Sequence, residues 1–172
     1  MQVPNDRVAA LLGSCKVLVI DDEPYIRKVI RTLLMTIGVR SIQEAGNGHA
    51  GLDAIRTFTP DVVLVDWEMP ELDGAGFVRA VRSPETFPHP DIPIIMLSAH
   101  SERSRVIEAA RLGINEYLLK PVSSQALQAR IVSVLAHPRP MVRRGDYYGP
   151  EPRKPSSYKP ETDYGHRTIV LL

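Results

Sequence analysis

Cysteine is nearly absent from this sequence, which has Cys15 alone among 172 residues. A single cysteine cannot form a disulfide within the chain. This is typical of proteins in a reducing compartment, so we predict a cytoplasmic location. Cys15 follows Leu12-Gly13-Ser14, a pattern found at lipoprotein cleavage sites, but the apolar stretch before it is shorter than the roughly 7–15 residues of a signal core. We therefore interpret Cys15 as a small hydrophobic residue near the first strand.

Long apolar runs and an excess of one charge are also missing. No run approaches the roughly 20 apolar residues that a membrane helix needs, so the sequence predicts no association with a membrane. The formal net charge is +1, and so small a value predicts no nucleic-acid partner. The histidines show no metal-ligand spacing, which argues against a zinc site.

Residues 16–136 alternate between short apolar segments and amphipathic ones. Five segments have the pattern of buried strands: Lys16–Ile20, Ser41–Ala45, Val62–Val65, Ile92–Leu97 and Glu116–Leu119. The spacing of apolar residues predicts a helix after each strand, over residues 26–37, 50–58, 75–82, 104–112 and 124–136. Strict alternation with connections of this length predicts an α/β fold in which helices cover both faces of a parallel sheet.

The segments before and after residues 16–136 lack this alternation of strands and helices. Residues 1–15 are predicted to form an N-terminal extension with at most a loose turn. Residues 137–172 are rich in proline and tyrosine, and their seven basic and four acidic side chains give a formal charge of about +3. Such a tail cannot bury a core, so we predict no separate folded domain there. Its last segment, Thr168–Leu172, is apolar and could pair with the sheet edge of this chain or of a neighbour.

Charged and hydroxyl side chains follow the predicted strands. Asp66 ends the most apolar strand, Asp21 and Asp22 follow the first, and Ser98 and Lys120 follow the fourth and fifth. Because the carboxyl ends of parallel strands share one edge of a sheet, we expect these side chains to converge there, where open α/β sheets bind ligands. Crowded carboxylates repel one another, and either a raised pKa or a divalent cation relieves the repulsion. Oxygen ligands without histidine or cysteine favour Mg²⁺ or Mn²⁺.

This set of side chains suits phosphoryl transfer. A carboxylate oxygen of Asp66 could attack phosphorus in line and form an acyl phosphate. The metal ion and Lys120 would offset the charge on the transferring group, and the Ser98 hydroxyl could donate a hydrogen bond to it.

Five separated motifs in this order resemble the receiver domain of two-component response regulators: Val19–Pro24, Asp66–Pro70, Asp73-Gly74, Ser98-Ala99 and Tyr117–Pro121. The resemblance implies a flavodoxin-like (βα)5 fold with strand order 2-1-3-4-5. It also implies that Asp66 accepts a phosphoryl group from a histidine kinase or a histidine phosphotransfer protein, with Mg²⁺ required.

The same resemblance implies the roles of further residues. Asp22, Asp66 and the backbone carbonyl of Glu68 would bind the metal directly, and Asp21 would bind it through water. The Lys120–Pro121 peptide would be cis. Ser98-Ala99 and Lys120 would bind the phosphoryl group, and Ser98 and Tyr117 would form a switch in which the tyrosine ring turns inward. Phosphorylation would then change the surface of the helix over 104–112, the last strand and the last helix, and so its affinity for an unknown downstream protein.

Several alternatives remain open from the sequence. The chain could act as a phosphate shuttle or sink within a phosphorelay rather than as an effector, and a homodimer is compatible with either role. Phosphatases with an aspartyl nucleophile carry a second aspartate two residues later, where this chain has Glu68. We therefore predict no turnover of a separate substrate. Flavin binding is disfavoured because an acidic loop, rather than a phosphate-binding loop, follows the first strand.

Overall fold

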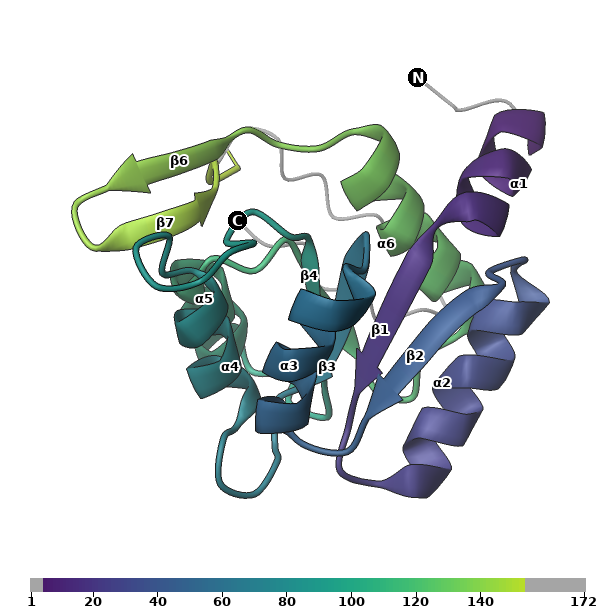
Figure 1. The fold of residues 1–172 in the computed structure, drawn as a ribbon, viewed down its shortest axis with the longest axis horizontal. Helices are drawn as coiled ribbons and strands as arrows, with labels where there is room; N and C mark the ends of the chain where they lie inside the picture. Colours follow the sequence, from purple (N-terminus) through teal and green to yellow (C-terminus); the bar gives the residue numbers. More distant parts are fainter. Residues whose placement is uncertain (1–4, 154–172) are drawn as a thin grey trace.

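The computed structural model describes residues 5–153 of the chain (Figure 1). Its secondary structure begins with a helix and then alternates strands and helices up to a final pair of strands. The elements are α1 (Asn5–Ser14), β1 (Lys16–Ile20), α2 (Pro24–Thr36), β2 (Ser41–Ala45), α3 (Gly48–Phe58), β3 (Val62–Asp66), α4 (Gly74–Val81), β4 (Ile94–Ser98), α5 (Arg103–Leu112), β5 (Glu116–Leu119), α6 (Ser124–Ala136), β6 (Met141–Arg144) and β7 (Tyr147–Pro150).

The five predicted strands form one parallel sheet in the order β2-β1-β3-β4-β5. The predicted flavodoxin-like fold and strand order are therefore confirmed. Every residue of β3 and β4 is buried, as expected for unbroken apolar runs at the centre of a parallel sheet. Asp66 is the last residue of β3, so the central strand carries it directly to the carboxyl edge of the sheet.

Two apolar layers enclose the sheet. Side chains of α2 and α6, with Leu12 of α1, pack against one face, and side chains of α3, α4 and α5 pack against the other (Figure 1). Short local signals fix where the helices begin. Asn47 caps α3 by accepting a hydrogen bond from Ala50 N at 2.8 Å, and Ser123 caps α6 in the same way with Ala126 N at 3.1 Å. The helix α6 begins and ends where the sequence predicted, and α3 starts two residues earlier than predicted.

The predicted boundaries of the folded unit were too narrow at the amino end. Residues 5–14 form the helix α1 rather than a loose turn, and Leu12 at its end is buried in the core. Cys15 follows it and is also buried, in agreement with its interpretation as a small hydrophobic residue. The helix therefore belongs to the packed domain.

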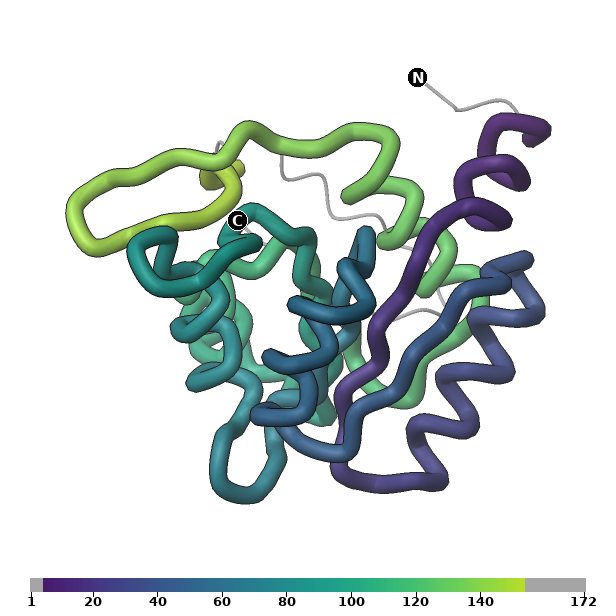
Figure 2. The backbone as a smooth tube through the Cα atoms, in the orientation of Figure 1, coloured from purple at the N-terminus to yellow at the C-terminus, as the bar shows by residue number. Residues whose placement is uncertain are grey.

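The prediction of an irregular tail was also wrong for its first part. Residues 141–144 and 147–150 form an antiparallel hairpin, β6–β7, joined by Gly145-Asp146. Gly145 has a φ of +60°, a conformation that glycine adopts at little cost in two-residue hairpin turns. Figure 2 shows the hairpin at one end of the molecule, opposite the turn between β1 and α2. The predicted Thr168–Leu172 strand lies outside the described residues.

No helix within residues 5–153 is long and apolar enough to cross a membrane.

Candidate functional site

Three aspartates meet at the carboxyl edge of the sheet. Asp21 and Asp22 follow β1, Asp66 ends β3, and one carboxylate oxygen of each lies within 4.8 Å of the others. Asp21 and Asp66 are buried, and Asp22 is the most exposed of the three. The convergence predicted from the neighbouring strand ends is therefore present in the structure.

Lys120 bridges two of these carboxylates. Its Nζ lies 2.8 Å from Asp21 Oδ2 and 3.0 Å from Asp66 Oδ1. The cis peptide between Lys120 and Pro121, which the resemblance implied, is present directly after β5. The other oxygen of Asp21, Oδ1, accepts a hydrogen bond from Glu23 N at 2.9 Å. Asp21 is thus held at both oxygens, which suits an indirect contact with a metal ion through water.

Burial and charge change the acidity of the groups at this site. Burial raises the pKa of Asp66, and the repulsion from Asp21 and Asp22 adds to it, although the hydrogen bond from Lys120 acts in the opposite direction. Burial alone would lower the pKa of Lys120, but its bonds to Asp21 and Asp66 outweigh burial and raise it. The lysine therefore stays charged, and the cluster gains from any further cation that ionises Asp66 fully.

The turn after β3 holds Asp66 in place and depends on Gly74. A Cβ atom on Gly74 would lie 2.5 Å from the backbone oxygen of Asp66, closer than real contacts allow. The Gly74 N–H donates to Trp67 O at 2.8 Å, and Asp73 caps α4 by accepting a hydrogen bond from Gly76 N. The Asp73-Gly74 motif thus closes the loop tightly over the end of β3.

Ser98 and Tyr117 are coupled through the loop that follows β4. Ser98 Oγ accepts a hydrogen bond from His100 N at 3.1 Å, and the Tyr117 hydroxyl donates to His100 O at 2.7 Å. Both side chains are buried, so the tyrosine ring already lies inward in this structure. Ala99 lies between Ser98 and His100 and is exposed. The predicted switch pair is therefore brought together, and the movement itself stays a prediction.

The side chain of Glu68 makes a contact that the sequence analysis did not foresee. Glu68 Oε1 lies 2.5 Å from His100 Nε2, and Glu102 Oε2 lies 3.5 Å from His100 Nδ1. The bond to Glu68 raises the pKa of His100, and the same bond lowers the pKa of Glu68. This bridge connects the loops that follow β3 and β4. The sequence offered no signal for it, because Glu68 and His100 belong to separate loops.

Trp67 lies directly beside the phosphoacceptor candidate. The ring is buried, and the guanidinium of Arg105 in α5 lies 5.1 Å from its centroid. Since Arg105 belongs to the first turns of α5, a shift of this helix relative to β3 changes the surroundings of the indole.

The donor set fits a hard divalent cation. Mg²⁺ binds carboxylate, carbonyl and water oxygens. Three negatively charged carboxylates gather here, without a histidine or cysteine among them. Asp21, Asp22 and Asp66 all offer carboxylate oxygens to such an ion, and the contact of Asp21 through water and the role of the Glu68 carbonyl stay predictions.

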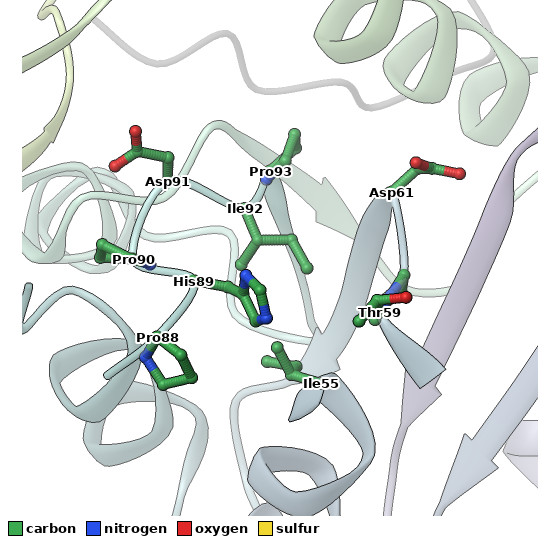
Figure 3. A pocket seen from close by; sticks show the side chains of 10 residues that line it. Ile55, Thr59, Asp61, Pro88, His89, Pro90, Asp91, Ile92 and Pro93 are labelled. Atoms are coloured by element: carbon green, nitrogen blue, oxygen red, sulfur yellow. The ribbon is translucent and has the colours of Figure 1, made fainter. Parts of the chain in front are cut away.

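A second concavity lies at the opposite edge of the sheet. It has a volume of about 450 Å³ and is lined by the end of α3, the start of β3 and the loop that precedes β4 (Figure 3). Figure 3 shows Ile55, His89 and Ile92 near its centre, with Asp61 and Asp91 toward one rim. Asp61 accepts a hydrogen bond from Lys16 N at 2.8 Å, so part of its charge already serves the fold. This pocket is separate from the aspartate cluster.

Comparison with known proteins gives a consistent result. The family model of the response regulator receiver domain matches residues 17–132. The chain is 34% identical to the chemotaxis protein CheY of Pseudomonas aeruginosa over 119 residues, which cover 69% of this chain and 94% of that protein. It is 42% identical over 120 residues to the probable transcriptional regulator ycf27 of Porphyridium aerugineum, covering 70% of this chain and 48% of that protein.

The solved structures agree with the sequence comparisons. Vibrio cholerae chemotaxis protein CheY4 superposes with a TM-score of 0.64 at 29% identity, covering 70% of this chain and 98% of that one. The residues that the family model matches include the aspartate cluster and nearly all of the sheet, and in each of the other comparisons about 30% of this chain lies outside the matched part. The chain belongs to the receiver-domain family of two-component response regulators.

Proposed function

We propose that Asp66 accepts a phosphoryl group from a phosphohistidine of a histidine kinase or histidine phosphotransfer protein, in a reaction that requires Mg²⁺. The observation that supports this most is the cluster of Asp21, Asp22 and Asp66 with Lys120 bridging two of them. A receiver that had lost its activity would have no need to bury two carboxylates around one ammonium, because burying charge is costly.

The chemical step uses the Asp66 oxygen that Lys120 does not contact. Lys120 binds Oδ1, and we assign the in-line attack on phosphorus to Oδ2. The new O–P bond forms as the P–N bond to the donor histidine breaks, and the electron pair of that bond returns to the imidazole nitrogen. Hydrolysis of the acyl phosphate by water later restores the carboxylate and releases inorganic phosphate.

Each neighbouring residue has a defined task in this step. Mg²⁺, held by Asp22, Asp66 and the Glu68 carbonyl and by Asp21 through water, would supply positive charge at the phosphoryl oxygens. Lys120 supplies a second positive charge from the other side. It also lowers the pKa of Asp66, in opposition to the larger effect of burial, which raises it.

Ser98 links the chemistry to the surface. Its hydroxyl oxygen accepts a hydrogen bond from His100 N and can still donate its own O–H, and we propose that the side chain moves toward the phosphoryl group and so gives up the bond to His100 N. The loop after β4 then loses one of its two ties, while the Tyr117 hydroxyl still binds His100 O. We propose that this changes the surface of α5, β5 and α6, by which a downstream protein recognises the phosphorylated chain.

The test uses Trp67 as an internal reporter. Beryllofluoride mimics the phosphoryl group, and adding it with Mg²⁺ is expected to change the fluorescence of Trp67, since Arg105 stacks on this ring. Incubation with a small phosphodonor such as acetyl phosphate is expected to add one phosphoryl group, detected by intact mass and removed by hydroxylamine.

Two variants make the result decisive. Asp66→Asn removes the nucleophile and is expected to abolish both responses. Asp53→Asn makes the same chemical change at an exposed carboxylate of α3 and is expected to leave both intact. An unchanged fluorescence in the wild-type chain, or an equal response in Asp66→Asn, would overturn the proposal. Steady release of product from an added phosphomonoester would show instead an enzyme with a separate substrate.

A further inference from the structure

Segment 137–153, which contains the hairpin, is fastened to the receiver at several points. Arg153 Nη2 lies 2.5 Å from the buried carboxylate of Glu116 in β5, and Arg139 donates to Asn115 O at 2.8 Å. On the outer side, the Tyr148 hydroxyl donates to Asp91. These contacts make the segment an integral layer of the domain.

The tie to Glu116 matters most, because this carboxylate is 1% exposed. Arg130 of α6 lies 3.5 Å from the other oxygen, Oε2, and Ser133 donates a hydrogen bond at 3.3 Å to Oε1, the oxygen that Arg153 contacts. A buried carboxylate needs such compensation. One of its two cations comes from Arg153, a residue beyond the part of the chain that the receiver family model matches. The domain therefore depends on a segment that lies outside the shared family region.

The hairpin also rests on the far end of α5. A Cβ atom on Gly149 of β7 would lie 2.7 Å from Gly113 Cα, and one on Gly113 would lie 2.6 Å from Tyr148 O. The two backbones are thus in direct contact, without side chains that could absorb a displacement. Figure 1 shows β7 against this end of α5.

The other end of α5 reaches the phosphorylation site. The helix begins at Arg103, directly after the loop in which His100 binds Ser98 and Tyr117. Tyr117 is the neighbour of Glu116 in β5. Both α5 and β5 therefore run from the switch residues to the points where segment 137–153 is attached.

We propose that segment 137–153 is a built-in responder of this receiver, which docks on α5 and β5 in the unphosphorylated form and loosens when Asp66 is phosphorylated. The inference rests on the proposed function. Release of Ser98 from His100 shifts the start of α5, and the helix carries the shift to Gly113. Because the backbones of Gly113 and Gly149 meet where an added Cβ atom would not fit, a shift of Gly113 disturbs this contact and weakens the docking of the hairpin. The loosened segment uncovers part of the α5–β5 surface for a partner.

Linkage makes a second, reciprocal requirement. If beryllofluoride weakens the docking of the hairpin, then docking must weaken the binding of beryllofluoride. Variants that abolish docking are therefore expected to bind beryllofluoride more tightly. Gly149→Ala forces the two backbones apart, and Arg153→Gln removes the cation from Glu116. Arg144→Gln is the matched control, because Arg144 is an exposed hairpin arginine that pairs only with Glu151 among the described contacts.

The experiment follows backbone amide exchange in the full chain by mass spectrometry, with Mg²⁺ alone and with Mg²⁺ and beryllofluoride. Amides of residues 141–150 are expected to exchange at least about fivefold faster with beryllofluoride, the lower end of typical coupling factors. Fluorescence titration of Trp67 is expected to show at least about fivefold tighter beryllofluoride binding in Gly149→Ala and Arg153→Gln, and wild-type binding in Arg144→Gln.

The outcomes separate this inference from the function on which it rests. If Trp67 and the amides of residues 98–102 respond to beryllofluoride while residues 141–150 exchange at an unchanged rate, the responder is refuted and the phosphoacceptor stands. If neither region responds, both proposals fail. Wild-type beryllofluoride affinity in folded Gly149→Ala and Arg153→Gln also refutes the coupling.

Discussion

Lys120→Met should destabilise the chain in a way that depends on pH and on Mg²⁺. The substitution keeps the length of the side chain and removes the one ammonium that lies 2.8 Å from Asp21 and 3.0 Å from Asp66. At such distances each ion pair is worth about 6 kcal/mol with an effective dielectric near 20, before the cost of desolvation. Removing one partner of a buried pair costs about 3–5 kcal/mol. Since the Lys120 side chain is 19% exposed, we expect about 3 kcal/mol near pH 7 without Mg²⁺.

The pH dependence follows from Asp66. Burial already raises the pKa of this carboxyl in the folded chain, and losing Lys120 raises it further. A carboxyl whose pKa is raised by folding weakens the fold only while it is ionised. The penalty of Lys120→Met is therefore expected to shrink as the pH falls through the raised pKa of Asp66. Mg²⁺ is expected to stabilise the variant more than the wild type, because it replaces the missing positive charge.

Urea unfolding near pH 7 and at about pH 4.5, with and without Mg²⁺, measures these differences. Lys28→Met is the control, since it makes the same change at an exposed position of α2. An equal loss of stability at both pH values, or an equal loss in Lys28→Met, would refute the electrostatic reasoning.

Three further predictions follow from groups around the core and the site. The pKa of His100 is raised by Glu68, so this bridge stabilises the fold fully below the ordinary histidine pKa of about 6.5 and is lost as pH rises through the raised value. NMR titration should show a lower imidazole pKa in Glu68→Gln, and an unchanged value would contradict the bridge. Arg82 is buried and donates to Gly113 O and Ile92 O at 2.8 Å each, so Arg82→Met should cost about 3 kcal/mol in urea unfolding. A loss below about 1 kcal/mol would mean that water replaces these bonds. Burial raises the pKa of the Cys15 thiol to about 11, so a thiol reagent at pH near 8 should label Cys15 only as the chain unfolds, and prompt labelling of the native chain would show an open site.

The sequence predicted the sheet and most of the site because both follow from local patterns. Unbroken apolar runs such as Val62–Val65 can be buried only in the middle of a parallel sheet, and parallel strands necessarily bring their final residues to one edge. Asp66 and Lys120 could therefore be placed together although 54 positions separate their numbers in the chain.

The features that were missed depend on contacts between distant segments. The bridge from Glu68 to His100 and the four bonds of Arg82 join loops whose relative positions no periodicity reveals. The hairpin did carry a local signal, since Gly145-Asp146 lies between two short segments that can form strands. The proline and charge content of residues 137–172 is typical of a segment without a fold, and this composition outweighed the hairpin signal.

The ties at the two ends of the domain matter to anyone who grafts this receiver onto another protein. A fusion joined at residues 16 and 136 would follow the boundaries predicted from the sequence, but it would discard Leu12, which is 2% exposed, and would remove Arg153 from Glu116. One junction would open a hole beside β1, and the other would leave an anion in the interior with half of its counter-charge. Chimaeras spliced outside residues 5–153 should express as stable modules, whereas tighter splicing should yield aggregates.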